Sequence, residues 1–270
     1  MKLAFTTLGC PSWDIEAIVT RASEYGFQGV DFRGYLGDMQ IYHHPDFAED
    51  REATAGRIAD AGLEVPCFAS GVGLMPTPHK STEESLTELR VYAELCPVFG
   101  ASYIRVFGQS IGDRTWEQGI DEAAETLDAM ARIAGDHGAK VLVETHDAWV
   151  HSHHVRALME RAESPHIGVL WDVHHPWRVA DETPEETWEK MQPWIENTHW
   201  KDATVPDHEL CLMGDGDLPL AAFFRVLREG GYDGYYTLEW EKKHHPELAD
   251  PEVAFPRYVE FMTALDSEYD

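Results

Sequence analysis

The chain has 270 residues, with 49 Asp or Glu against 21 Lys or Arg, and its formal net charge is −28. Such a surface repels nucleic-acid phosphates and anionic membranes, so we expect neither a nucleic acid nor a membrane as a partner. No stretch approaches the roughly 18 consecutive apolar residues of a membrane span. The hydrophobic fraction of 43% is ordinary for a globular protein with a sizeable core.

The acidic residues are spread along the chain and do not form a tail, so they are expected to form a solvated surface. A further hypothesis is adaptation to high salt, where screening removes the mutual repulsion of the carboxylates. Thermal melts with and without molar KCl test it, and a midpoint that does not rise with salt contradicts it.

The four cysteines, Cys10, Cys67, Cys96 and Cys211, are scattered and form no CxxC pair. This pattern favours reduced thiols over a disulfide framework or a zinc ribbon. The first residues run straight into an apolar segment without the pattern of a signal peptide. We therefore expect a cytoplasmic protein.

Short apolar runs rich in β-branched and aromatic residues alternate with helical patterns along the whole chain. Strands are predicted at Leu3–Leu8, Gly29–Arg33, Glu64–Ser70, Tyr103–Phe107, Lys140–His146, His166–Asp172, Asn197–Asp202 and Tyr235–Trp240. Helices are predicted at Asp14–Tyr25, Phe47–Ala61, Thr82–Phe99, Trp116–His137, Val155–Arg161, Pro184–Ile195, Leu220–Glu229 and Pro251–Leu265. Several helical patterns end at a glycine just before the next strand, which is a usual helix stop.

Eight strands in strict alternation with eight helices predict an α/β fold, a single (β/α)₈ TIM barrel that forms one domain over residues 1–270. A doubly wound open sheet is the alternative. It would normally carry a glycine-rich loop after the first strand, but Thr7–Trp13 has neither GxGxxG nor P-loop spacing. The barrel is therefore the better prediction.

Four successive predicted strands, the fifth to the eighth, end in a carboxylate or an imidazole: Glu144, Asp172, His199 and Glu239. Reactive residues of a β/α barrel lie at these strand ends. Buried carboxylates are costly unless they are paired or bound to a cation. One Glu at a strand end is more often a cap or an ion-pair partner, but four in succession favour a metal site. The mixed oxygen and nitrogen donors suit one divalent ion, with Mn²⁺, Mg²⁺ or Co²⁺ preferred to Zn²⁺.

The alternation of side chains along a strand places Glu144 with His146 on one face, and His199 with Lys201 on one face.

Other polar residues near the strand ends allow more ordinary interpretations. Asp31 and Arg33 end the second strand and could reach the pocket, but an ion pair inside the barrel is the preferred interpretation. Arg105 is open between the same two roles. The run His151, His153 and His154 looks like a metal cluster. It begins a helix, however, and is interpreted as surface or pocket rim.

Motifs in order along nearly the whole chain resemble the xylose isomerase-like barrel superfamily, the sugar phosphate isomerase/epimerase group that also contains the apurinic-endonuclease-like proteins. They are the second strand Gly26–Arg33, Glu144-x-His146, Asp172-x-x-His175, His199-x-Lys201-Asp202, the turn Gly214-x-Gly216-Asp217, Gly231–Gly234 and the final Glu239. Their order and spacing are specific to the superfamily and not to one enzyme.

The resemblance implies that Glu144, Asp172, His199 and Glu239 bind the metal, that His175 is a substrate or outer-sphere contact, and that His146 and Lys201 line the pocket. It also implies that the metal holds adjacent carbonyl and hydroxyl oxygens of a sugar and stabilises a cis-enediolate. Glu144 and Glu239 would then move the proton from opposite sides of the substrate. Homo-oligomers are common in the superfamily, so one is expected here.

Departures from related patterns narrow the reaction. The third strand, Val65–Ser70, lacks the histidines of the trinuclear zinc endonucleases, and Thr204–Pro206 replaces an arginine of the ketose 3-epimerases. The region after the first strand has no clear Arg/Lys cluster for a phosphorylated sugar. The leading hypothesis is a metal-dependent isomerase or epimerase of a small carbohydrate. The alternatives are a dehydratase of the inosose or dehydroshikimate type and a sugar- or metal-binding protein without catalysis.

Overall fold

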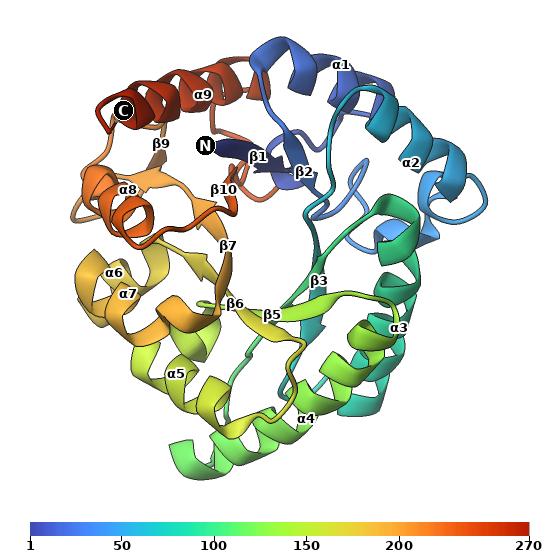
Figure 1. Cartoon of the computed structure of the whole chain (residues 1–270), viewed down its shortest axis with the longest axis vertical. Coiled ribbons are helices and arrows are strands. Elements are labelled where there is room, and N and C mark those ends of the chain that lie inside the picture. Colours follow the sequence, from blue (N-terminus) through green and yellow to red (C-terminus); the bar gives the residue numbers. More distant parts are fainter. Residues whose placement is uncertain (270) are drawn as a thin grey trace. The chain divides into compact units, whose positions relative to one another are not determined.

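The computed structural model describes residues 1–269, and strands alternate with helices along them (Figure 1). The parallel strands are β1 (Lys2–Thr6), β2 (Gly29–Asp31), β3 (Cys67–Gly73), β4 (Tyr103–Phe107), β5 (Lys140–Glu144), β6 (Ile167–Asp172), β7 (Ile195–Trp200) and β10 (Tyr235–Leu238). The helices are α1 (Ile15–Tyr25), α2 (Arg51–Asp60), α3 (Thr82–Phe99), α4 (Trp116–Asp136), α5 (Ser152–Arg161), α6 (His174–Ala180), α7 (Pro184–Met191), α8 (Leu220–Glu229) and α9 (Pro251–Ser267). This is the element order of a (β/α)₈ barrel.

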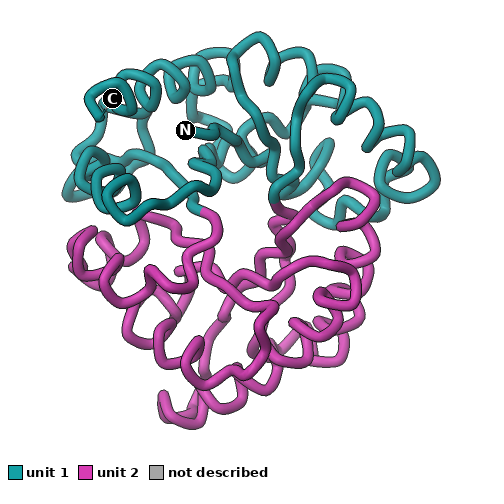
Figure 2. Tube along the Cα trace, viewed as in Figure 1, with its two compact units in different colours: residues 1–66, 198–270 teal, residues 67–197 magenta. Residues whose placement is uncertain are grey.

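The chain forms two compact units (Figure 2). The chain passes from unit 1 to unit 2 just before β3 and returns to unit 1 inside β7. Unit 1 contains Met1–Pro66 and the chain from Thr198 onward, and its parallel strands follow the order β2-β1-β10-β7. Unit 2 contains Cys67–Asn197, and its parallel strands follow the order β6-β5-β4-β3. The prediction that residues 1–270 form a single domain stays a prediction.

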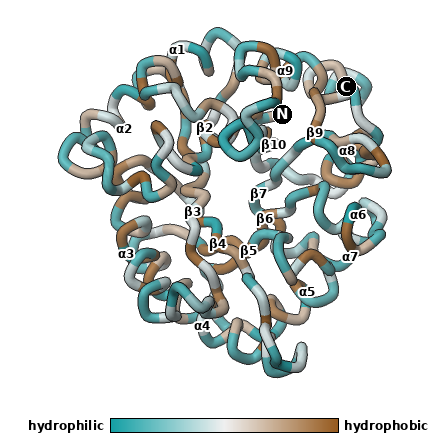
Figure 3. The backbone as a smooth tube through the Cα atoms, turned by 180° about the vertical axis from the view of Figure 1, so that it is seen from behind, coloured by the Kyte–Doolittle hydropathy of each residue, from teal (hydrophilic) through white to brown (hydrophobic). Residues whose placement is uncertain are grey.

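Within each unit the sequence pattern explains the packing. All six residues of β6 are buried, as expected for a parallel strand covered on both faces. Helix α4 buries one stripe that includes Ile120, Leu127 and Met130, and hydrophobic and hydrophilic segments alternate along it (Figure 3). Thr115 and Gln118 form a capping box at its start.

Aromatic rings hold helix α9 against β1 in unit 1. Phe255 of α9 lies 4.7 Å from Phe5 of β1 between ring centroids, and Tyr258 stacks on Phe27 at 6.1 Å. A Cβ atom at Gly9 would come within 2.7 Å of the Phe255 ring, so only glycine allows this close approach. The loop after β1 is thereby fixed at the end of the strand where the site residues lie.

The structure corrects the predicted bounds at several places. Strand β3 begins at Cys67, not at Glu64, because Pro66 has no N–H to donate to a neighbouring strand. Helix α7 ends at Met191, since Pro193 cannot continue it. The short helix α6 and the antiparallel pair β8 (Asp202–Ala203) and β9 (Leu210–Cys211) were not predicted. In the described part of the chain, no helix is long and apolar enough to cross a membrane.

The predicted glycine stops are confirmed. Gly26, Gly62, Gly100, Gly138 and Gly231 all have positive φ, the left-handed conformation that ends a helix. Each of them precedes a strand-forming segment.

Candidate metal centre

Two predicted ligands lie together in unit 2, at the ends of neighbouring strands. Glu144 ends β5 and Asp172 ends β6, both residues are 0% exposed, and one carboxylate oxygen of each lies within 4.8 Å of the other residue's. Nη1 of Arg105, from β4, lies 3.4 Å from Oε2 of Glu144. The sequence left the role of Arg105 open, and the structure shows the ion pair. Two buried carboxylates so close repel each other, and one arginine balances only one of them.

Asp172 is held by the backbone of the turn into helix α6. Its Oδ1 accepts hydrogen bonds from the backbone N–H groups of His174 (2.9 Å) and His175 (3.3 Å). Thr145 Oγ1 donates to the Asp172 carbonyl (3.1 Å) and accepts from Asp172 N (3.0 Å). These contacts fix the carboxylate, and its other oxygen, Oδ2, lies 3.5 Å from Nδ1 of His175.

His175 and His146, two predicted substrate contacts, also lie in unit 2. Nδ1 of His175 lies 2.9 Å from the Thr145 carbonyl, which can only accept, so Nδ1 carries the proton and the neutral ring has its lone pair on Nε2. His146 packs edge to face on His175 with centroids 4.7 Å apart, and its Nδ1 lies 2.8 Å from Oδ1 of Asp147. The strand ends at Glu144, because His146 N donates to the Glu144 carbonyl (2.8 Å), so strand alternation does not extend to His146.

The other two predicted ligands, His199 and Glu239, lie together in unit 1. Along β7, Trp200 packs on Phe223 and Tyr236, with centroids 6.4 and 5.6 Å away. His199 lies on the opposite face by alternation, where its Nδ1 is 3.3 Å from Oε1 of Glu239. Glu239 follows β10, and its N–H continues the ladder by donating to the Trp200 carbonyl (2.8 Å).

Lys201 shares the face of His199, as the alternation predicted. Its side chain is 1% exposed, and Nζ lies 2.5 Å from Oε2 of Glu239 and 2.9 Å from Oε1 of Glu241. Burial by itself would raise the pKa of Glu239, but the charges of Lys201 and His199, with their hydrogen bonds, bring that pKa well below its usual value. Glu239 is therefore an ionised carboxylate at neutral pH.

Asp31 is a site residue that the sequence did not single out for the metal centre. It ends β2, is 0% exposed, and its Oδ2 lies 4.0 Å from Nε2 of His199 and 3.5 Å from Oγ1 of Thr237. A carboxylate beside the second nitrogen of a ligating histidine orients the ring and raises its basicity. Asp31 was interpreted as a partner of Arg33. The signal that could have pointed from Asp31 to the site is its position at the carboxyl end of β2, which pairs with β1.

The donor sets of both units fit a divalent ion. When two donor atoms bind one ion at about 2.0–2.2 Å, and the donor–metal–donor angle lies between a right angle and the tetrahedral angle, the donors are about 3.0–3.5 Å apart. The distance of 3.3 Å between His199 Nδ1 and Glu239 Oε1 falls in this range. In unit 2 the carboxylates of Glu144 and Asp172 are buried next to each other, and a bound cation would offset their mutual repulsion. The assignment of all four residues to one ion stays a prediction.

Asp202, which follows Lys201 in the motif, organises the turn Gly214–Asp217. Its Oδ2 accepts from Gly214 N (2.9 Å) and Gly216 N (3.0 Å), and its Oδ1 accepts from Ala203 N (2.9 Å) and Leu218 N (3.4 Å). Burial raises the pKa of Asp202 although these N–H groups lower it. A Cβ at Gly216 would lie 2.2 Å from Asp202 Oδ1, which explains the glycine.

Asp202→Ala is expected to destabilise the protein by about 3 kcal/mol or more, since each buried N–H left without an acceptor costs about 1–3 kcal/mol. Urea unfolding monitored by fluorescence measures the loss. Asp207→Ala, in the same segment but exposed, is the matched control and should change stability by less than about 0.5 kcal/mol. Equal stability of the two variants would contradict this role of Asp202.

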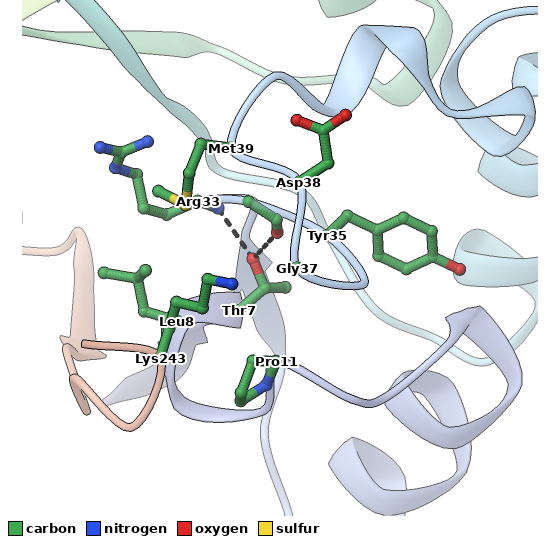
Figure 4. A pocket seen from close by; sticks show the side chains of 10 residues that line it. Thr7, Leu8, Pro11, Arg33, Tyr35, Gly37, Asp38, Met39 and Lys243 are labelled. Atoms are coloured by element: carbon green, nitrogen blue, oxygen red, sulfur yellow. Dashed lines mark hydrogen bonds between the residues drawn. The ribbon is translucent and has the colours of Figure 1, made fainter. Parts of the chain in front are cut away.

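A pocket in unit 1 lies beside the ends of β1 and β2 and is lined by Thr7, Leu8, Pro11, Arg33, Gly34, Tyr35, Gly37, Asp38, Met39 and Lys243 (Figure 4). Thr7 Oγ1 accepts from Arg33 N (2.8 Å) and donates to the Gly34 carbonyl (2.6 Å). Lys243 N donates to the Leu8 carbonyl (3.0 Å). The sequence showed no cationic cluster after the first strand, because Arg33 and Lys243 come from loops far apart in the chain.

Comparisons with known proteins agree with this element order. A family model described as "Xylose isomerase-like TIM barrel" matches residues 19–264.

Three solved structures superpose over nearly the whole chain. The probable 3-DHS dehydratase AsbF from Bacillus anthracis is 18% identical, with a TM-score of 0.80 and coverage of 97% of this chain and 99% of that chain. The IolI protein with a bound zinc atom is 16% identical, with a TM-score of 0.84 and coverage of 100% and 99%. The 3-keto-D-glucoside 4-epimerase YcjR from E. coli is 16% identical, with a TM-score of 0.77 and coverage of 99% of each chain.

One curated protein matches only a short part of the chain. It is the pyrroloquinoline-quinone synthase of Cronobacter sakazakii (strain ATCC BAA-894), 29% identical over 70 residues. The match spans 25% of this chain and 28% of that protein. A similarity of this extent carries no conclusion about function.

Proposed function

Because the chain belongs to the xylose isomerase-like TIM barrel family, which confirms the predicted fold class, we propose that it is a divalent-metal-dependent isomerase or epimerase. Its substrate would be a small polyhydroxylated carbonyl compound. The observation that carries the proposal is Glu239, a buried carboxylate kept ionised by Lys201 and His199 at a strand end. The structures that resemble the chain include an epimerase and a dehydratase, which favours an enzyme.

The proposed metal ligands are Glu144, Asp172, His199 and Glu239. The ion is expected to be Mn²⁺, Mg²⁺ or Co²⁺, with Zn²⁺, which the similar IolI protein binds, as the alternative. A bound divalent ion supplies a Lewis acid for the oxygen of the carbonyl that reacts. Asp31 lies 4.0 Å from Nε2 of His199 and would favour an orientation of the ring with Nε2 toward the carboxylate.

The two glutamates are proposed as the proton-transfer groups. Glu239 is ionised and can accept the proton from the carbon next to the carbonyl. Glu144, in its protonated form, would give a proton to the opposite face of the substrate and be left as a carboxylate whose charge Arg105 balances. Lys201 keeps Glu239 charged and, with His146 and His175, would hold substrate hydroxyls. With Nδ1 of His175 donating to the Thr145 carbonyl, its Nε2 in the neutral form would accept a hydrogen bond from a substrate hydroxyl.

Deuterium exchange tests the proposal. The metal-loaded protein is incubated in D₂O with a panel of ketoses, aldoses and inososes, and the substrate carbon is followed by NMR. Deuterium is expected next to the carbonyl of at least one compound, and exchange should stop after treatment with a chelator and return with Mn²⁺. No exchange across the panel, or exchange that a chelator leaves unchanged, would contradict the proposal.

A dehydratase acting on an acidic substrate is the second candidate function, and the pocket lined by Arg33 and Lys243 favours it. Two cationic side chains suit a carboxylate or phosphate on the substrate. The same removal of a proton next to a carbonyl would then be followed by loss of a hydroxyl group as water. Formation of an enone, seen by its ultraviolet absorbance, distinguishes this reaction from isomerisation.

Lys243→Gln is expected to lower kcat/KM for an acidic substrate about 10- to 100-fold, because a hydrogen bond to a charged group contributes about 1.5–3 kcal/mol. A neutral sugar should be turned over at an unchanged rate. Lys242→Gln is the matched control, since Lys242 donates to the Leu248 carbonyl and does not line the pocket. An equal loss for acidic and neutral substrates would contradict an anion-binding role.

We also propose a small carbohydrate as the binding partner, a homo-oligomeric state, and a cytoplasmic location without nucleic-acid or membrane partners. The free cysteines favour a reducing compartment: Cys10, Cys67 and Cys96 are buried, and burial raises the pKa of Cys96 to about 12. Light scattering coupled to size exclusion tests the oligomer, and a monomer at micromolar concentration would contradict it.

A further inference from the structure

A second group of metal-binding residue types lies in unit 2, apart from Glu144 and Asp172. His151 precedes helix α5, His153 lies in the first turn of that helix, and Glu182 lies between helices α6 and α7. One donor atom of each residue lies within 4.8 Å of the other two. The chain thus brings together two imidazoles and a carboxylate from segments about 30 positions apart.

Glu182 is fixed in place before any ion binds. The residue is 7% exposed, its Oε1 accepts from Ser152 N (3.1 Å), and its Oε2 accepts from Thr187 Oγ1 (3.1 Å). Nζ of Lys190 lies 3.7 Å from Oε1, but that side chain is 33% exposed and can move into solvent. Each carboxylate oxygen can accept two hydrogen bonds, so both keep a lone pair for a cation. Ligands held in this way by neighbours bind metal more tightly than mobile ones.

The rings of His151 and His153 lie close together, beside a third histidine. The His151 and His153 centroids lie 5.4 Å apart, and the neighbouring His154 ring lies 4.0 Å from His153. His154 also stacks on Trp116 at 3.4 Å, and its buried Nδ1 has no hydrogen-bond partner among the described residues.

Capping of helix α5 does not by itself explain this arrangement. The Glu182 contact with Ser152 N satisfies one N–H at the start of the helix, which is an ordinary structural role. It does not require two histidines beside the carboxylate. The sequence interpreted His151, His153 and His154 as surface or rim residues, which agrees with the exposure of His153. It did not include Glu182, because only the folded structure shows that this residue lies beside the histidines.

We propose that His151, His153 and Glu182 bind a second divalent ion of the zinc class. Two imidazole nitrogens and one carboxylate oxygen are a usual donor set for Zn²⁺, and they leave a position for water. The ion would join the segment that follows β5 to the segment between α6 and α7. These segments follow in the chain the strands that end in Glu144 and Asp172, so the second ion would stabilise the part of unit 2 that carries the predicted metal ligands. The site does not depend on the proposed reaction.

Metal stoichiometry tests the proposal. Full-length protein is stripped with a chelator, dialysed against Zn²⁺ and analysed for bound metal by mass spectrometry. His151→Ala/His153→Ala should bind one ion fewer per chain than the wild type. The control His137→Ala/His166→Ala removes two histidines of the same unit that lie outside the cluster, and should bind the wild-type number. Equal metal content of the cluster variant and the wild type would overturn the proposal.

Two further variants separate this site from the proposed centre and from misfolding. His199→Ala should lose the ion of the proposed metal centre and keep the ion held by the cluster. The visible absorbance of Co²⁺ bound at the cluster reports that second ion. Glu182→Gln keeps an oxygen for Ser152 N. It should lower the affinity for Co²⁺ by about 100-fold or more, at or above the upper end of what loss of an outer-sphere partner costs, because a direct carboxylate ligand becomes a neutral amide. Zn²⁺ should raise the melting temperature of the wild type more than that of His151→Ala/His153→Ala. An equal rise in both would count against the proposal.

Discussion

Glu239→Gln is expected to lower the rate of deuterium exchange into the substrate by about 10³-fold, within the 10²–10⁴-fold range of a general base. The amide has nearly the same size and can still accept a hydrogen bond from Lys201, but it cannot accept a proton from carbon. It is also a poor ligand for a divalent ion, so bound Mn²⁺ should fall as well. Exchange measured by NMR and metal content measured on the same sample report the two effects.

Glu241→Gln is the matched control for this variant. Glu241 contacts the same Lys201 Nζ at 2.9 Å, but its side chain is 24% exposed and it is not a predicted ligand. Its variant should keep exchange within about threefold of the wild type, a change of less than about 0.7 kcal/mol in the barrier. If Glu239→Gln exchanges deuterium at the wild-type rate, Glu239 is not the base and the proposed mechanism fails.

The strand ends could be located from the sequence because of their pattern. A short apolar run that ends in a carboxylate or imidazole is visible without a structure, and Glu144, Asp172, His199 and Glu239 are all buried at or just after strand ends. Alternation also placed His199 and Lys201 correctly on one face, since both side chains contact Glu239, although Lys201 is the first residue after β7. For His146 the shared face with Glu144 stays a prediction, because the strand stops two residues earlier.

Partners that come from distant parts of the chain could not be predicted. Asp31 lies near His199, and Glu182 lies near His151 and His153, only because the chain folds. The local sequence pattern around each residue does not indicate these contacts. Helix α6 escaped prediction because it has only seven residues and contains Pro176, so it shows no full amphipathic period. The role of Asp202 in holding the turn Gly214–Asp217 likewise depends on a contact across more than ten residues.

Lys201→Met is expected to destabilise the folded protein by about 3–5 kcal/mol at pH 7.5, the usual effect of removing one partner of a buried ion pair. Methionine fills nearly the same volume but leaves Glu239 buried beside His199 without the ammonium group. The pKa of Glu239 in the wild-type fold lies well below its usual value of 4.5, and Lys201 is the largest cause of the lowering. Without Lys201 burial dominates, and the pKa of Glu239 should rise.

The sign of the pH dependence follows from this shift. A depressed pKa in the fold gives stability that is present above the unfolded pKa and is lost as the pH falls through the folded pKa. The wild type therefore has this contribution at neutral pH, and Lys201→Met lacks it. The difference in unfolding free energy between the two should be largest near neutral pH and should shrink as the pH falls below about 4, where the unfolded Glu is protonated. Urea unfolding at several pH values measures it.

The double variant Lys201→Met/Glu239→Gln separates the charge from the packing. With no ionised carboxylate at position 239, loss of the ammonium group should cost less than about 1.5 kcal/mol, as a volume-conserving change in a core does. A coupling energy between the two substitutions is then expected from the double-mutant cycle. If Lys201→Met costs the same in both backgrounds and at every pH, its effect is packing alone, and Lys201 does not keep Glu239 ionised.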